Sequence, residues 1–155
     1  MCKAGSDSTG DGSITNPFET IQHAINSANS ADTVFVADGV FYENISFSKN
    51  LTLIGSGIQH TIIDASYSGF GINAFGSSII VHIEGFSVRH VSSGFAAITV
   101  NGNYHNATVN AKIRNNEVYD NNNSGIYIVN DHHGTSHIEY NLIHNNSRPL
   151  YMILR

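Results

Sequence analysis

The chain has 155 residues, the length of one domain, and its hydrophobic fraction of 41% is sufficient for a packed core. The formal net charge is −5 and the seven Lys and Arg residues are scattered, so no basic surface for nucleic acid is expected. One cysteine excludes an internal disulfide and a zinc site built on cysteines, and no apolar run is long enough to span a membrane.

The first predicted element is an amphipathic helix over residues 16–28, NPFETIQHAINSA. One face of this helix is apolar: Phe18, Ile21, Ile25 and Ala28. Asn16 is the expected N-cap, Pro17 takes the first helical position and Glu19 the third. We expect this helix to cover the first coil of the solenoid that the rest of the chain predicts.

Residues 33–47, TVFVADGVFYENISF, predict two short strands joined by a turn at Asp38 and Gly39. We therefore expect a single domain in two parts. Residues 1–32 form an N-terminal strand or loop and the capping helix, and residues 33–155 form the coils.

A repeat of 25 to 30 residues follows, and it predicts the fold. The segment 113–122, IRNNEVYDNN, matches 138–146, IEYNLIHNN, at an offset of 25, and 81–90, VHIEGFSVRH, matches 113–122 at an offset of 30. One coil earlier, 51–55 matches 81–85, again at 30. Each repeat holds three short apolar strands separated by Gly, Asn, Asp or Ser. Strands this short bury a face only by stacking, so we predict about five coils of an all-β, three-sided parallel β-helix.

The remaining strands follow from the same offsets. Residues 61–64 and 70–73 supply two further short strands in the second coil. The third strands of successive coils are aligned at offsets of 30 and then 25. Ala96 is aligned with Ile126 and then with Tyr151, and Ile98 is aligned with Ile128 and then with Ile153. Asn116 falls over Asn141 at a bend and predicts a stacked asparagine ladder, the alternative being that both are ordinary surface turn residues.

Residues 4–57 resemble the N-terminal end of right-handed parallel β-helix proteins of the pectin-lyase-like superfamily. The likeness lies in G-S-D, then PFETIQHAI, then DTVFVADGVFYENI, then LTLIG. The later coils resemble the generic repeats of that superfamily, so the likeness covers nearly the whole chain. It implies a right-handed solenoid, but the superfamily includes polysaccharide lyases, glycoside hydrolases, phage tailspikes and adhesins, so it does not specify an activity. Its members are commonly exported, whereas no signal peptide is visible here, which leaves the compartment unknown.

Enzymes of the superfamily usually have many more coils. Here 148–155, RPLYMILR, occupies the third-strand position of a last coil, and no capping helix follows it. Such an end exposes apolar side chains and unpaired strand edges. We therefore predict a homodimer packed end to end through this coil, with a buried interface of Tyr151, Ile153 and Leu154. The alternative is that the chain is a piece of a longer β-helix.

The repeat also predicts columns of outward-facing side chains, because neighbours of inward residues point outward. On the first strand these columns are His82, Lys112 and His137, and beside them Glu84, Arg114 and Glu139. On the second strand the column is Arg89, Tyr119 and His144.

The column of Glu84, Arg114 and Glu139 is interpreted as an alternating charge ladder, in which each pair contributes about 0.2–1 kcal/mol. The column that contains Lys112 is either a solvated face with neutral histidines or a site for an anion, including a sulfated or uronic sugar. Several tyrosines could contact sugars: Tyr104, Tyr119, Tyr127 and Tyr140.

Histidines and an aspartate gather in the loop between two coils, in NDHHGTSH. Asp131, His132 and His133 belong to this loop, and the loop one coil earlier contains His105. Such a set suits zinc or nickel, but loops accept any polar residue, so we favour a plain loop and expect no cofactor.

The sequence is compatible with three functions. The favoured one is a non-catalytic carbohydrate-binding or surface-interaction module with a polysaccharide partner. The second is a polysaccharide lyase or glycoside hydrolase, with Lys112 or Arg114 as the base of a lyase, although no Asp pair for hydrolysis lies on one face. The third is a self-associating scaffold. Whether the protein is an enzyme stays undecided, with binding preferred.

Overall fold

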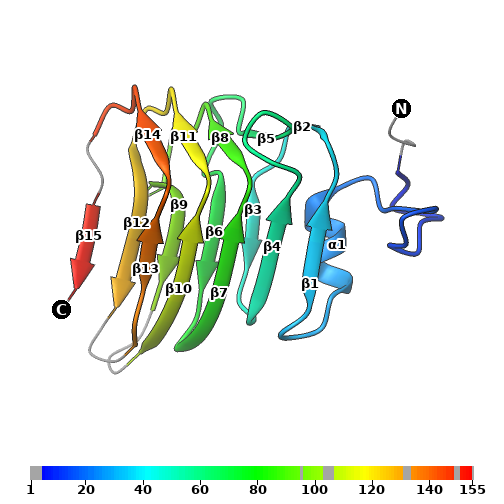
Figure 1. The fold of residues 1–155 in the computed structure, drawn as a ribbon, viewed down its shortest axis with the longest axis horizontal. Coiled ribbons are helices and arrows are strands. Elements are labelled where there is room, and N and C mark those ends of the chain that lie inside the picture. The colour runs from blue at the N-terminus through cyan, green and yellow to red at the C-terminus, as the bar shows by residue number, and fades with distance from the viewer. Residues whose placement is uncertain (1–4, 95, 103–106, 131–133, 149–150, 155) are drawn as a thin grey trace.

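The computed structural model describes residues 5–94, 96–102, 107–130, 134–148 and 151–154. These residues form one helix, α1 (Ile21–Ser27), and fifteen strands in three parallel sheets of five strands each. Consecutive strands belong to different sheets, so the chain winds as a three-sided solenoid (Figure 1). The predicted all-β parallel solenoid with an N-terminal helix is therefore confirmed. Within the described ranges, no helix has the length and apolar character needed to cross a membrane.

The strands are distributed evenly among the sheets. The first sheet contains β1 (Thr33–Val36), β4 (Leu51–Gly55), β7 (Ser78–Glu84), β10 (Thr108–Arg114) and β13 (His137–Glu139). The second sheet contains β2 (Gly39–Phe41), β5 (Thr61–Asp64), β8 (Ser87–Arg89), β11 (Glu117–Tyr119) and β14 (Leu142–His144). The third sheet contains β3 (Ile45–Phe47), β6 (Ile72–Phe75), β9 (Ala96–Asn101), β12 (Ser124–Asn130) and β15 (Tyr151–Leu154). The first coil thus has three strands, and the prediction of only two in residues 33–47 was wrong.

The core consists of aliphatic side chains that stack from coil to coil. In the first sheet Leu53, Ile83 and Ile113 occupy paired positions and are fully buried. Alternate residues along β10 are buried and half-buried, which is the period of two that a strand requires. The offsets of 30 and 25 predicted from the repeat are confirmed in the first sheet and again between β8, β11 and β14.

The predicted register of the third sheet was wrong. Ile126 pairs with Ile98, an offset of 28, and Tyr151 pairs with Tyr127, an offset of 24. The cause is the length of the bend between the second and third sheets. Arg89 to Ile98 spans nine residues, whereas the equivalent Tyr119 to Ile126 spans seven. Such an insertion shifts the third sheet without disturbing the other two.

The N-terminal helix begins four residues later than predicted. The N-cap is Thr20, whose hydroxyl accepts a hydrogen bond from the His23 N–H at 3.2 Å, and not Asn16. The Asp7 carboxylate accepts hydrogen bonds from the backbone N–H groups of Glu19 and Thr20. These contacts hold the chain extended before the helix, so Pro17, Phe18 and Glu19 lie outside it. Of the predicted apolar face, Ile21 and Ile25 are buried and Ala28 packs against the core.

Charged and amide side chains from the first coil hold the helix in place. Glu43 accepts hydrogen bonds from the N–H groups of Ile21 and Gln22, both at 2.9 Å, and Lys49 Nζ donates to the carbonyl of Ala28 at 2.6 Å. Both charges have the favourable sign for the helix dipole. The Gln22 amide also bonds both the N–H and the C=O of Ser46 in β3. The helix therefore provides hydrogen-bond partners for the N–H and C=O of Ser46 at the outer edge of the third sheet.

Left-handed residues stack at the bend between the first and second sheets, called here the first bend. Gly85, Asn115 and Tyr140 follow β7, β10 and β13, with φ values of 80°, 52° and 56°. A Cβ on Gly85 would lie 2.6 Å from the carbonyl oxygen of Gly55 one coil earlier, so this position requires glycine. Asparagine tolerates the left-handed region better than tyrosine.

The predicted asparagine ladder is confirmed at the first bend. Asn116 Nδ2 donates to Asn141 Oδ1 at 3.1 Å and to the carbonyl of Ile83 at 3.0 Å, and Asn116 Oδ1 accepts from the Phe86 N–H at 3.1 Å. Each amide thus satisfies backbone groups of the preceding coil that the bend leaves unpaired.

A second ladder, which the sequence reasoning did not identify, lies at the bend between the second and third sheets. Asn121 Nδ2 donates to Asn146 Oδ1 at 2.8 Å and to the carbonyl of Val88 at 3.2 Å. Asn121 Oδ1 accepts from the Val91 N–H at 2.9 Å. The repeat had aligned Asn121 with Asn146, so this alignment was the available signal.

The C-terminal coil consists of β13, β14 and β15, each the last strand of its sheet. The predicted interface residues Tyr151, Ile153 and Leu154 belong to β15, but their side chains lie outside the described part of the structure. Ile153 pairs with Val129 rather than with Ile128, so the predicted alignment of this strand was wrong by one residue.

Candidate functional site

The outer face of the first sheet brings together the two predicted columns. Lys112 pairs with His82 on one side and with His137 on the other, and Arg114 pairs with Glu84 and Glu139. All six side chains therefore lie on β7, β10 and β13, on the same face of one sheet.

The charge ladder exists between Glu84 and Arg114. Arg114 Nε donates to Glu84 Oε2 at 2.8 Å and Asn115 Nδ2 donates to Glu84 Oε1 at 2.9 Å. His82 Nε2 lies 2.9 Å from the same Oε2 but outside hydrogen-bond geometry. Within the described residues Arg114 has no ion pair with Glu139, so the ladder extends over one pair only.

The pKa of Glu84 lies below its usual range. Burial acts to raise this pKa, but the hydrogen bonds from Asn115 and Arg114 and the positive charge of Arg114 outweigh that effect. Glu84 is therefore ionised at neutral pH and serves as a fixed acceptor, not as a proton donor.

Lys112 is the uncommitted cation of this face. Among the described residues it has neither a hydrogen bond nor an ion pair, although it is half-buried between two histidines. Its ammonium group therefore keeps its donors for solvent or a ligand.

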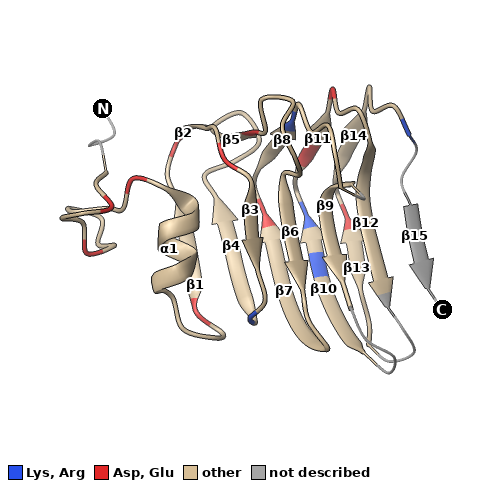
Figure 2. Ribbon diagram, turned by 180° about the vertical axis from the view of Figure 1, so that it is seen from behind, with Lys and Arg blue, Asp and Glu red and all other residues tan. Residues whose placement is uncertain are grey.

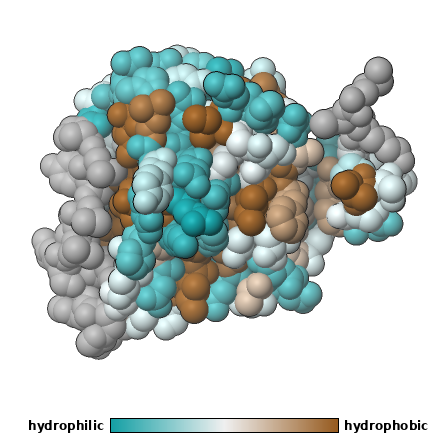
Figure 3. Space-filling model, in the orientation of Figure 1, coloured by the Kyte–Doolittle hydropathy of each residue, from teal (hydrophilic) through white to brown (hydrophobic). Residues whose placement is uncertain are grey.

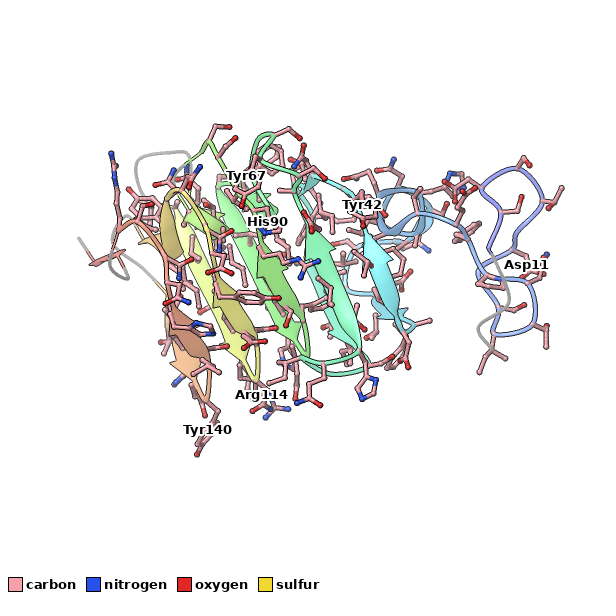
Figure 4. All side chains as sticks on the ribbon, turned by 90° about the horizontal axis from the view of Figure 1, so that it is seen from above. Asp11, Tyr42, Tyr67, His90, Arg114 and Tyr140 are labelled. Carbon is pink, nitrogen blue, oxygen red and sulfur yellow. The ribbon has the colours of Figure 1, made fainter. Side chains whose placement is uncertain are left out.

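A groove of about 380 Å³ lies at the first bend, next to this face. Its polar side chains are those of Ser56, Glu84, Asn115 and Asn116, and Tyr140 and Leu142 line it from the last coil. The Tyr140 side chain is 81% exposed, so its ring is available to a ligand. Tyr140 and Arg114 project from the same side of the solenoid (Figure 4). This volume is in the range of small-ligand sites.

The column on the second sheet forms a separate polar cluster. Arg89 Nε donates to Asp64 Oδ2 at 2.9 Å and Arg89 Nη1 donates to the Tyr119 hydroxyl at 3.2 Å. The Tyr119 ring stacks on the His144 ring, with centroids 5.3 Å apart. His144 Nε2 lies 3.2 Å from the Glu117 carboxylate. These groups bind one another, which supports a structural role for them.

Asp64 is the buried carboxylate of the second-sheet cluster. Burial acts to raise its pKa, but hydrogen bonds from the Ser66 N–H, from His90 and from Arg89 outweigh it, so the pKa is lowered. Tyr67 stacks on the His90 ring beside it, with centroids 4.6 Å apart, as Figure 4 shows.

The other predicted site residues fall elsewhere. Tyr127 lies on β12 in the third sheet, away from the columns of the first sheet. The metal candidates His105, Asp131, His132 and His133, and also Tyr104, lie outside the described residues. Within the described ranges there is no group of three His, Cys, Asp or Glu residues that could hold a metal ion.

The sequence reasoning missed the groove itself. The sequence pattern shows Tyr140 only as one of several scattered tyrosines and gives Asn115 no role. The available signal was their alignment with Gly85 at offsets of 30 and 25, directly after the three first-sheet strands. Comparisons with protein-family models, with curated proteins and with solved structures find no match for this chain.

Proposed function

We propose that this protein is a non-catalytic carbohydrate-binding β-solenoid whose ligand occupies the groove at the first bend and the adjoining face of the first sheet. The observation that supports the proposal best is the groove of about 380 Å³, where the exposed Tyr140 ring stands beside Glu84 and Asn115. Sugars have apolar ring faces and hydroxyl edges. They therefore match an exposed aromatic ring next to fixed acceptors and amides.

The adjoining face provides a direction for a longer ligand. Lys112 and the flanking His82 and His137 form a column across β7, β10 and β13, on the sheet face that adjoins the groove. Coils about 4.8 Å apart present these side chains at regular intervals, which suits a polymer better than a compact ligand. A polysaccharide chain running from the groove over Lys112 is therefore the expected partner.

Binding is preferred over catalysis because of the carboxylates. A glycoside hydrolase needs a carboxylic acid that keeps its proton near neutral pH. Glu84, the carboxylate in the groove, is held ionised by Arg114 and Asn115. A lyase remains the alternative because Lys112 is uncommitted. We also propose that the chain is a few-coil relative of the pectin-lyase-like superfamily, on the N-terminal resemblance alone.

The variant Tyr140→Asn tests the binding site without weakening the fold. Asparagine already occupies the equivalent left-handed position at Asn115, so Tyr140→Asn removes the ring while relieving backbone strain. We expect the affinity for the best ligand of a polysaccharide panel to fall about tenfold, equivalent to about 1.4 kcal/mol, by isothermal titration.

The matched control is Tyr42→Asn. Tyr42 is 71% exposed but does not line the groove, so its replacement should leave the affinity unchanged. Equal affinities of wild type and Tyr140→Asn, or failure of every polymer to bind, would exclude the groove as a carbohydrate site.

Self-association is the second proposal. Within the described part of the chain β13, β14 and β15 each have a neighbouring strand on one side only, so their outer edges offer unpaired backbone groups to another chain. We expect light scattering of the 16.8 kDa chain at micromolar concentration to give about twice the monomer mass, as a two-fold dimer requires. A monomeric mass under these conditions contradicts the predicted homodimer.

A further inference from the structure

A larger groove lies at the opposite end of the solenoid, between the N-terminal segment and the first coil. Its volume is about 700 Å³. It follows β1 and β2 along their whole length, from residue 32 to residue 41, and its other walls are residues 17–20 and the helix α1. None of the residues that line the first-bend groove takes part in it.

The wall of this groove is the free edge of a sheet. β1 is the terminal strand of the first sheet, and among the described residues β4 is its only partner, so one row of its backbone N–H and C=O groups has no described strand beside it. The third sheet differs, because Gln22 bonds the N–H and the C=O of Ser46 in β3. The helix therefore closes the edge of β3 and leaves the edge of β1 open.

Two exposed apolar side chains line this groove, one on β1 in the first sheet and one on β2 in the second sheet. Phe35 on β1 is 76% exposed and Val40 on β2 is 42% exposed, and both line the groove. Figure 3 shows apolar surface over β1 and β4, next to the N-terminal segment. An exposed apolar strand edge is a template for pairing with a strand of another chain.

The rim of the groove is acidic. Four carboxylates line it, and no Lys or Arg does: Asp11, Glu19, Asp32 and Asp38. Residues 5–49 contain six Asp and Glu and one basic residue, Lys49, whose Nζ is bonded to the carbonyl of Ala28 at the C-terminal end of the helix. Figure 2 shows the acidic residues around α1, β1 and the N-terminal segment, while β8 and β10 carry basic ones. The field at this end of the solenoid therefore attracts cations and repels anions.

We propose that the free edge of β1 binds an extended peptide segment of a partner protein, with apolar residues at alternate positions and Lys or Arg at its ends. The segment adds to the first sheet as a sixth strand. Backbone hydrogen bonds to β1 supply affinity that does not depend on sequence. The apolar side chains contact Phe35 and Val40, and the flanking cations face the carboxylates of the rim.

The test uses three labelled peptides that differ in one property each. The probe is KVTVTVK, the charge control is EVTVTVE and the backbone control is KVPVPVK, in which prolines replace the two threonines and remove their backbone donors while all three valines stay. By fluorescence anisotropy with the full chain, we expect KVTVTVK to bind at least about tenfold more tightly than either control. Amide hydrogen exchange of β1 should slow when KVTVTVK is bound.

Two variants locate the site. Phe35→Ser removes the exposed ring, and the double variant Glu19→Gln, Asp38→Asn removes two rim charges. Both variants should lower the affinity for KVTVTVK by about tenfold, while Tyr42→Ser, outside the groove, should leave this affinity unchanged. Equal affinity for the three peptides, no binding of KVTVTVK, or insensitivity to Phe35→Ser would overturn the proposal. Self-association that Phe35→Ser abolishes would identify a second copy as the occupant and would also overturn it.

Discussion

Replacing Asn116 by alanine is expected to lower the free energy of unfolding by about 3 kcal/mol, because two buried backbone groups lose their partners. The Asn116 side chain is 1% exposed. Its Oδ1 accepts from the Phe86 N–H, and its Nδ2 donates to the carbonyl of Ile83. Water cannot replace the amide at this depth, so the desolvation penalty of both groups is added to the lost hydrogen bonds. Urea unfolding followed by far-UV circular dichroism measures the change.

Two comparison variants test whether stability depends on the ladder asparagines or on any asparagine of the chain. Asn141 also bonds two backbone groups, the Asn116 N–H at 3.0 Å and the Ile113 carbonyl at 2.8 Å, but Asn141→Ala should cost less because this side chain is half-buried and water can reach the groups it leaves. Asn122→Ala should change stability by less than about 0.5 kcal/mol, because Asn122 is exposed and makes no side-chain contact in the described structure. If Asn116→Ala is as stable as Asn122→Ala, the ladder does not stabilise the solenoid.

Replacing Asp64 by alanine is expected to lower the free energy of unfolding by about 3 kcal/mol, because it leaves the positive charge of Arg89 without its partner. The Asp64 side chain is 6% exposed and accepts hydrogen bonds from Arg89 Nε at 2.9 Å and from the Ser66 N–H at 2.9 Å. His90 Nδ1 lies 3.0 Å from the same carboxylate. Thermal unfolding at pH 7 measures the loss. The control is Asp120→Asn, an exposed position where asparagine also tolerates the left-handed φ of 53°.

The stabilising contribution of Asp64 should depend on pH. Its folded pKa lies below the unfolded value of about 3.8, so the folded state favours the ionised carboxylate. The contribution is therefore fully present above about pH 5 and is lost as the pH falls through the lower, folded pKa. We expect the difference in stability between wild type and Asp64→Asn to shrink as the pH falls from 5 to about 2. A difference that stays constant over this range would contradict the prediction.

Much of the candidate face could be predicted from the repeat. Lys112 pairs with His82 and His137 as the offsets of 30 and 25 require. The alternation of apolar and polar residues along β10 was sufficient to place Arg114 on the outside. The groove could not be predicted, because it depends on the left-handed backbone at Asn115 and Tyr140. A pattern of apolar residues does not reveal a backbone angle.

The sequence by itself determined the solenoid, the inward columns and the ladder from Asn116 to Asn141. Each of these depends on residues that recur at a constant spacing, and a constant spacing is visible in the chain. Only the tertiary structure decided the register of the third sheet and the start of the helix. The first depends on the length of an irregular bend, and the second on Asp7 and Glu43, which reach the helix N-terminus from distant positions in the chain. The free edge of β1 is likewise visible only in space, because it exists where Gln22 closes one sheet edge and nothing in the described structure closes the next.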